Sequence, residues 1–326
     1  STPIAKTWEQ MCEAYEYGIR DIWIVNVGDL KPQELPLSFF MNLAYDFDTY
    51  GTAHPNETGD YTQKFARSCF KDAFIFEGER ENDVALAAWA LEEYTRLNGI
   101  RRPEALNKDV YHPVHFEESR RMIERADRLE KVCLDLRSRC KEAYLPSFTE
   151  LIFYPAVASA NLLRMQLWAG LNAFYGKKGM VYANSFQDKV EAAIAYDGKL
   201  IEEYHSLLEG KWNHMMSSKH VGFVNWNDEG SDFPKLLEVK GKEGIYPAIR
   251  IMGESVFHRE GTLICRIPCN AGERKVEFVN EEDKKIEETI QTIQDSETFN
   301  KVKDGVSTTI ENVKNDETLN CFFKHG

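Results

Sequence analysis

The chain has 326 residues, of which 43% are hydrophobic and 12% aromatic, enough apolar material for a large core, so a globally disordered protein is excluded. Its net charge of -13 argues against nonspecific binding to nucleic acid or to an acidic membrane surface. No apolar run approaches the roughly 20 residues of a membrane span. The length predicts about two domains.

Residues 4–18 carry apolar side chains at every third or fourth position, which predicts a helix. Residues 21–27 follow as a continuous apolar and β-branched run, typical of a strand buried on both faces of a parallel sheet. Pro36 at a first helical position predicts a second helix over 36–46. This α–β–α unit indicates an α/β protein, yet no partner strands for 21–27 are evident. We therefore expect residues 1–60 to be the end of a larger α/β domain.

The next 150 residues keep a helical pattern with long apolar stripes and short breaks, which predicts an antiparallel helical bundle. The expected helices are 58–78, 81–99, 114–143, 146–175 and 179–208. Short β-type runs follow at 248–251, 262–267 and 275–279, and two amphipathic helices are expected in the acidic tail. The predicted domain boundaries are 1–60, 61–234, 235–280 and 281–326.

Seven cysteines, an odd number at wide spacings, do not form the pattern of a disulfide framework, so reduced thiols are expected. Cys265 and Cys269 form a CxxxC pair without a second pair, for which a zinc site competes with two plain strand cysteines. His112 and His115 leave a similar choice between chelating a metal and capping a helix start. We expect no metal and no other cofactor.

Phosphate-loop, kinase, dinucleotide-binding, nucleophile-elbow and HExxH signatures are absent from the sequence. The polar residues Asn26, Asp29 and Lys31 at the end of the predicted strand are more informative. Alternation along a strand places Asn26 on the face of Ile22 and Ile24, which in a barrel points inward at the mouth where active sites form. Asn26 could bind substrate hydroxyls there; alternatively, it caps the next helix while Asp29 and Lys31 form a local ion pair.

Several ordered segments with unusual chemistry resemble the xylan α-glucuronidases of glycoside hydrolase family 115. The first is Ile22-Trp-Ile-Val-Asn-Val-Gly-Asp-Leu-Lys-Pro32, which is similar to the Trp-(I/V)-x-Asn-Val-Gly-Asp-Leu-Lys-Pro strand and loop of that family. The others are 43–47, 94–104, 153–157, 210–216 and 220–223, together with Asp197, Tyr204, His205 and Trp226. The resemblance covers about residues 4–235.

The resemblance implies a protein with an N-terminal α/β domain, a (β/α)8 barrel, a helical bundle and a C-terminal β-rich region. This chain would be mainly α: a terminal α–β–α piece of the (β/α)8 barrel, then the antiparallel helical bundle and a small β-containing C-terminal region. The implied activity is the inverting removal of 4-O-methylglucuronic acid from glucuronoxylan, by a periplasmic or secreted enzyme of a xylan-degrading bacterium.

The resemblance also implies roles for the candidate site residues. The acid and base that inversion requires are expected upstream of this chain, and Asp29 is the one carboxylate here at the expected barrel mouth. Asn26 would bind sugar hydroxyls and Lys31 would pair with the uronate, whereas Trp212 and Trp226 are candidate sugar-stacking platforms. Two other classes stay open: a noncatalytic carbohydrate-binding relative, and a helical module that forms homodimers through the bundle.

Overall fold

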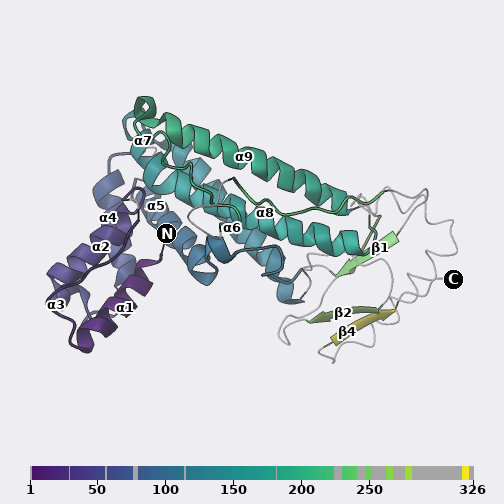
Figure 1. Cartoon of the computed structure of the whole chain (residues 1–326), viewed down its shortest axis with the longest axis horizontal. Helices are drawn as coiled ribbons and strands as arrows, with labels where there is room; N and C mark the ends of the chain where they lie inside the picture. The colour runs from purple at the N-terminus through teal and green to yellow at the C-terminus, as the bar shows by residue number, and fades with distance from the viewer. Residues whose placement is uncertain are drawn as a thin grey trace. The chain divides into compact units, whose positions relative to one another are not determined.

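The computed structural model describes most of the first 240 residues and four short strands beyond them (Figure 1). The described ranges are 2–28, 30–55, 57–75, 80–113, 115–180, 182–223, 230–240, 247–251, 262–266, 276–280 and 318–322. Over these ranges the chain is mainly helical, which confirms the coarse fold class expected from the sequence. No helix in the described ranges is long and apolar enough to cross a membrane.

Long helices dominate the described part of the chain. The α-helices are α1 (Ile4–Glu16), α2 (Glu34–Tyr45), α3 (Phe47–Tyr50), α4 (Thr58–Phe70), α5 (Arg80–Ile100), α6 (Glu118–Arg139), α7 (Leu145–Phe148), α8 (Tyr154–Lys177) and α9 (Ala183–Gly210). Short 3-10 turns are η1 (Pro103–Ala105), η2 (His115–Glu117) and η3 (Glu142–Tyr144), whereas η4 (Thr149–Phe153) is a π-helix. Each predicted helix outside the tail is observed, although the one expected over 58–78 ends at Phe70 and the one over 146–175 is α7, η4 and α8 in series.

The described strands form two antiparallel pairs. β1 (Pro247–Ile251) pairs with β3 (Val276–Asn280), and β2 (Thr262–Arg266) pairs with β4 (Thr318–Phe322). The first three match the predicted β-type runs, and β4 was not predicted. The tail helices expected over 281–317 and Cys269 of the CxxxC pair lie outside the described residues.

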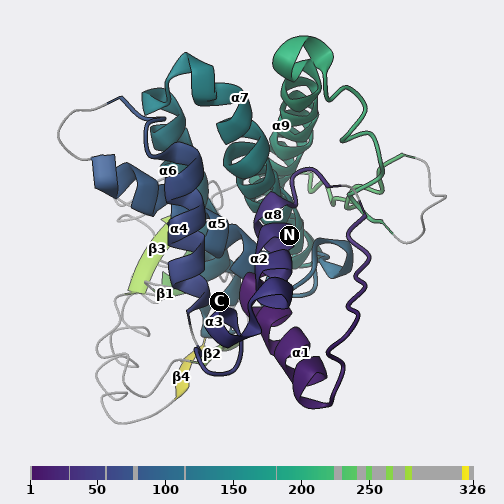
Figure 2. The same ribbon diagram turned by 90° about the vertical axis from the view of Figure 1, so that its left-hand side faces the viewer.

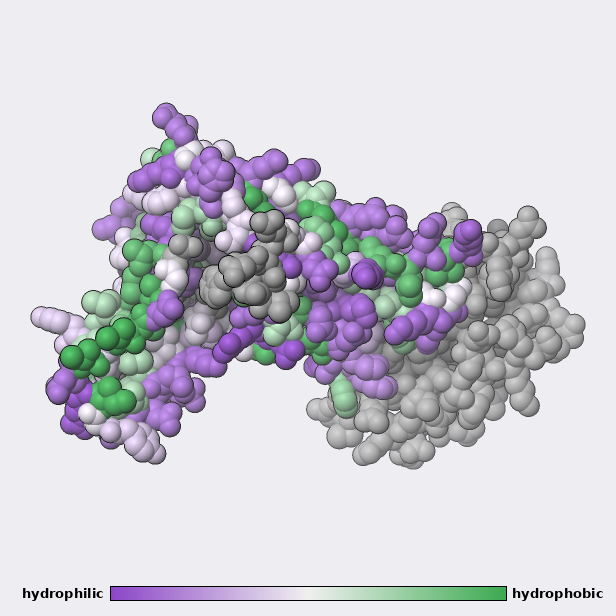
Figure 3. Space-filling view, viewed as in Figure 1, coloured by the Kyte–Doolittle hydropathy of each residue, from purple (hydrophilic) through white to green (hydrophobic). Residues whose placement is uncertain are grey.

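The buried strand predicted over 21–27 is wrong for this structure. Residues 22–27 join no ladder among the described residues, and Figure 2 shows the segment between α1 and α2 as an irregular thread. Ile22 and Ile24 are 73% and 91% exposed, and Figure 3 shows apolar side chains gathered on the surface around α1–α3. A strand needs hydrogen-bonded neighbours, and the described residues offer none here. The (β/α)8 barrel piece and the bundle stay predictions.

The chain divides into two compact units. Unit 1 is made of Ser1–Leu106, Arg125–Leu163 and Ile194–Asp232, and unit 2 of Asn107–Glu124, Arg164–Ala193 and Phe233–Gly326. The four sequence-based domain boundaries stay predictions.

Aromatic packing and a partly buried ion pair stabilise unit 1. The ring of Phe148 on α7 meets Phe70 and Phe74 edge-on, with centroids 6.0 and 5.9 Å apart, and all three side chains are at most 2% exposed. Such edge-to-face pairs add stabilisation beyond the buried area alone. Arg139 on α6 donates to Asp83 on α5 at 2.8 Å, so this buried carboxylate is paired across the helix contact.

Two asparagines fix the segment 233–240 in unit 2. The Asn172 side chain donates to the carbonyl of Leu237 at 2.9 Å and accepts from the Leu237 amide at 2.8 Å. Asn184 repeats this pattern with Val239, with both distances at 2.9 Å. Each asparagine side chain thus satisfies both the backbone amide and the backbone carbonyl of one residue, as a neighbouring strand would. Gly176 permits the approach, because a Cβ there would lie 2.8 Å from the Leu237 Cβ.

Candidate functional site

The loop that follows residues 22–27 is held locally by Asn26. The Asn26 Oδ1 atom accepts from the Gly28 amide at 3.1 Å, and Gly28 adopts a positive φ of 63°, which glycine tolerates best. Asn26 therefore caps its own turn, and the alternative that it caps the next helix is wrong, since the N-cap of α2 is Gln33 without a side-chain bond. The Asn26 side chain is exposed, and Asp29 lies outside the described residues.

Lys31 lies at the end of this loop between two carboxylates. Its Nζ contacts the Oε1 atom of Glu34, in the first turn of α2, and lies 2.9 Å from Oε1 of Glu150 in η4. The same nitrogen lies 5.4 Å from the ring centroid of Trp212, within cation–π range. We call Lys31, Glu34, Glu150 and Trp212 the Lys31 cluster. The structure therefore brings together two of the predicted site residues, Lys31 and Trp212, whereas Trp226 lies outside the described residues.

Glu150 is the most buried acid of the cluster, with its side chain 9% exposed. Burial raises the pKa of Glu150, and the neighbouring charge of Glu34 raises it further. The hydrogen bond from Lys31 lowers this pKa, but the net value still lies above the ordinary one for a glutamate. Burial alone would lower the pKa of Lys31, but its bonds to Glu34 and Glu150 raise it instead. With both acids ionised the three charges sum to -1, so a proton taken up by Glu150 makes the cluster neutral.

Glu34 and Glu150 were not identified from the sequence. A single glutamate in a helical pattern is typical of a solvated face, which hides Glu34. Glu150 had a usable signal, because it is the one charged residue in the largely apolar run Phe148–Phe153, where a charge needs a partner. It also belongs to a π-helix, an element that often occurs at functional sites.

Two tyrosines lie next to the cluster. The rings of Tyr154 and Tyr204 are 4.8 Å apart, and Tyr204 is fully buried. Within the described ranges the Tyr204 hydroxyl has no hydrogen-bond partner. Burial raises the pKa of Tyr204, as do the charges of Glu150 and Glu34, so the phenol stays protonated and able to donate.

A histidine and an aspartate join the segment after α9 back to that helix. The Nε2 atom of His220 lies 2.9 and 3.0 Å from the two carboxylate oxygens of Asp197. The hydrogen bond to Asp197 raises the pKa of His220, against the lowering effect of burial. The Nε2 atom of His205 accepts from the Met216 amide at 3.1 Å. These contacts fix the turn that carries Trp212.

The described residues gather no group of three or more side chains that could hold a metal ion. His112 and His115 stack their rings at 4.0 Å, and the His115 amide donates to Nδ1 of His112 at 2.8 Å. This contact occupies the lone pair with which His112 Nδ1 could bind a metal. His112 thus accepts from the backbone ahead of α6, and the choice between metal binding and capping stays a prediction.

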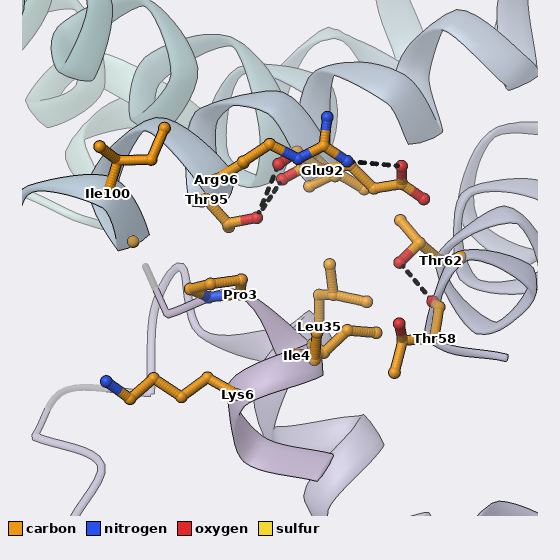
Figure 4. A pocket seen from close by; sticks show the side chains of 14 residues that line it. Pro3, Ile4, Lys6, Leu35, Thr58, Thr62, Glu92, Thr95, Arg96 and Ile100 are labelled. Atoms are coloured by element: carbon orange, nitrogen blue, oxygen red, sulfur yellow. Dashed lines mark hydrogen bonds and ion pairs between the residues drawn. The ribbon is translucent and has the colours of Figure 1, made fainter. Parts of the chain in front are cut away.

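A separate pocket of about 440 Å³ lies in unit 1 among α1, α2, α4 and α5, and contains none of the predicted site residues. Figure 4 shows two of its polar contacts, Arg96 with Glu92 and Thr62 with the Thr58 carbonyl. The Thr95 hydroxyl likewise donates to backbone carbonyls of its own helix. Thr62, Thr95 and Arg96 therefore already bond within their own helices.

Comparison with known proteins agrees with the resemblance seen in the sequence. No curated protein matches the chain significantly. The chain is similar in fold to a family GH115 4-O-methyl-α-glucuronidase, BtGH115A, which is described as specific for decorated arabinogalactans, with a TM-score of 0.54 and 18% identity. This likeness covers 98% of the chain and 44% of that protein, so the chain spans less than half its length. Residues 1–105, which include Asn26, Lys31 and Glu34, match the sequence profile of glycosyl hydrolase family 115, which supports assigning the chain to that family.

Proposed function

We propose that the chain is part of an inverting α-glucuronidase that removes glucuronic acid or its 4-O-methyl ether from plant polysaccharides. The observation that carries this proposal is the family match over residues 1–105, which includes the loop from Asn26 to Lys31. The meeting of Lys31 with Trp212, 181 positions further along the chain, supports a sugar-binding role for this loop. An indole face beside polar groups suits a sugar ring, which has an apolar face and a polar rim.

The acid and base of the reaction are not assigned to Glu34 and Glu150. An inverting pair needs about 6.5–9.5 Å between its carboxyl groups to admit the attacking water. Both glutamates contact the same Lys31 nitrogen, so their nearest oxygens lie closer together than that. We therefore propose that these glutamates support the site, and that the acid and base belong to barrel segments of the complete enzyme outside this chain. Asp29 remains a weaker candidate for the catalytic acid or base, as proposed from the sequence.

Two substrates fit the proposal. Glucuronoxylan follows from the family resemblance, and decorated arabinogalactan is the substrate named for BtGH115A. Both present a uronic acid on a neutral glycan, so the proposed site for the uronic acid is common to them. The two differ in the glycan that continues beyond this sugar.

The test is release of the uronic acid by the full-length protein on both glycans, with the anomer of the first product followed by NMR. We expect the inverted anomer, and we expect Asn26→Ala to lower kcat/KM by roughly 10- to 150-fold through loss of a substrate hydrogen bond. Gln10→Ala, an exposed amide on α1, is the matched control and should keep wild-type activity. Binding of either glycan without turnover would instead indicate the noncatalytic carbohydrate-binding relative.

A further inference from the structure

The Lys31 ammonium lies among three partners inside the chain. An ammonium offers three donors and no acceptor. Glu34 and Glu150 take two directions, and the face of Trp212 lies in a third, at 5.4 Å. The Lys31 side chain is only 31% exposed, so little of it remains open to a ligand.

The charge of the cluster also disfavours a substrate carboxylate. One ammonium faces two glutamates, so a uronate brought to Lys31 would be a third acid beside a single cation. A uronate binds more favourably to a cation that is not already paired with carboxylates of the protein. The contacts of Lys31 therefore disagree with the uronate-binding role that the resemblance implies for this residue.

The loop that carries Asn26 depends on few contacts at its two ends. Near its start, the indole of Trp23 donates to the Ile19 carbonyl at 2.7 Å and packs 6.0 Å from Phe40. Near its end stands Lys31. Between them the segment joins no ladder in the described ranges, so these two side chains set where Asn26 lies.

We propose that Lys31 is a positioning residue, which fixes the loop carrying Asn26 against η4 and Trp212 and does not meet the substrate carboxylate. Glu150 is its buried counterpart on η4, and Glu34 closes the contact from α2. The proposal deepens the proposed function, on which its catalytic part rests. Recognition of the uronate then belongs to other groups of the complete site.

The test combines two readouts on the full-length protein carrying Lys31→Met, Glu150→Gln, or both. The first is hydrogen exchange of residues 26–33, which reports the loop without any substrate. We expect each single variant to speed this exchange at least tenfold, and the double variant to add little, since both changes break the same contact. Lys131→Met, an exposed lysine paired with Asp135 on α6, is the control and should leave the loop unchanged.

The second readout is kcat/KM on a glucuronoside and on its neutral glucose analogue. A positioning role predicts that Lys31→Met lowers both by the same factor, and that Lys31→Arg, which keeps the charge, recovers most of the loss. A loss at least tenfold larger on the glucuronoside, with loop exchange unchanged, would show that Lys31 binds the uronate and would overturn the proposal. If the wild-type enzyme cleaves neither compound, the proposed function fails, and the exchange readout still decides the role of Lys31.

Discussion

Replacing Asn172 tests how the segment 233–240 is held in unit 2. The side chain is fully buried and makes three bonds: it donates to the carbonyls of Ala183 and Leu237, both at 2.9 Å, and accepts from the Leu237 amide at 2.8 Å. Each such bond contributes roughly 1 kcal/mol net, and more when its partner is left buried without a substitute. Asn172→Ala should therefore lower the free energy of unfolding by about 3 kcal/mol.

Asn184→Ala is the matched control, because that side chain makes only the two bonds to Val239 and is half-buried. We expect it to cost about 1 to 2 kcal/mol. The assay is urea unfolding followed by circular dichroism, with hydrogen exchange at residues 235–240 as the local readout. The reasoning is refuted if Asn172→Ala costs less than Asn184→Ala, or if neither variant speeds exchange in the segment.

Three further outcomes are expected. Phe148→Ala, which removes a buried ring packed against those of Phe70 and Phe74, should cost about 3–5 kcal/mol in urea unfolding, and a cost under 1 kcal/mol would contradict the packing. Cys133 is fully buried and burial raises the pKa of its thiol to about 12, so a thiol reagent followed by mass spectrometry should label the half-buried Cys69 long before it. Asp197 raises the pKa of His220, so their pairing stabilises the fold fully below the unfolded value of about 6.5 and fades as pH rises through the higher folded pKa. His220→Gln should thus lower the thermal midpoint more at pH 6 than at pH 8.5, and an equal loss at both values would exclude a charged pair.

The helical part of the fold could be predicted because helices depend on local sequence. Apolar side chains at every third or fourth position gave α1, α5 and α9 with ends within a few residues. The run 21–27 failed for the opposite reason. Its composition suits a buried strand, but burial and pairing depend on other segments, and in the described structure Ile24 is almost fully exposed.

The site could be predicted only in part. Lys31 and Trp212 were both named, yet their contact joins segments far apart in the chain, and one sequence without related sequences holds no record of such a contact. Glu34 and Glu150 were missed because their significance depends on that same contact. Glu150 alone left a trace, as a single charge inside an apolar helical run.

The role of the loop from Asn26 to Lys31 in an α-glucuronidase is the central claim, and product analysis on glucuronoxylan tests it most directly. The full-length protein should release 4-O-methylglucuronic acid with inversion, and Asn26→Ala should lower kcat/KM by roughly 10- to 150-fold while the melting temperature barely moves. Wild-type activity in Asn26→Ala, or a loss only in proportion to lost folded protein, would contradict the claim.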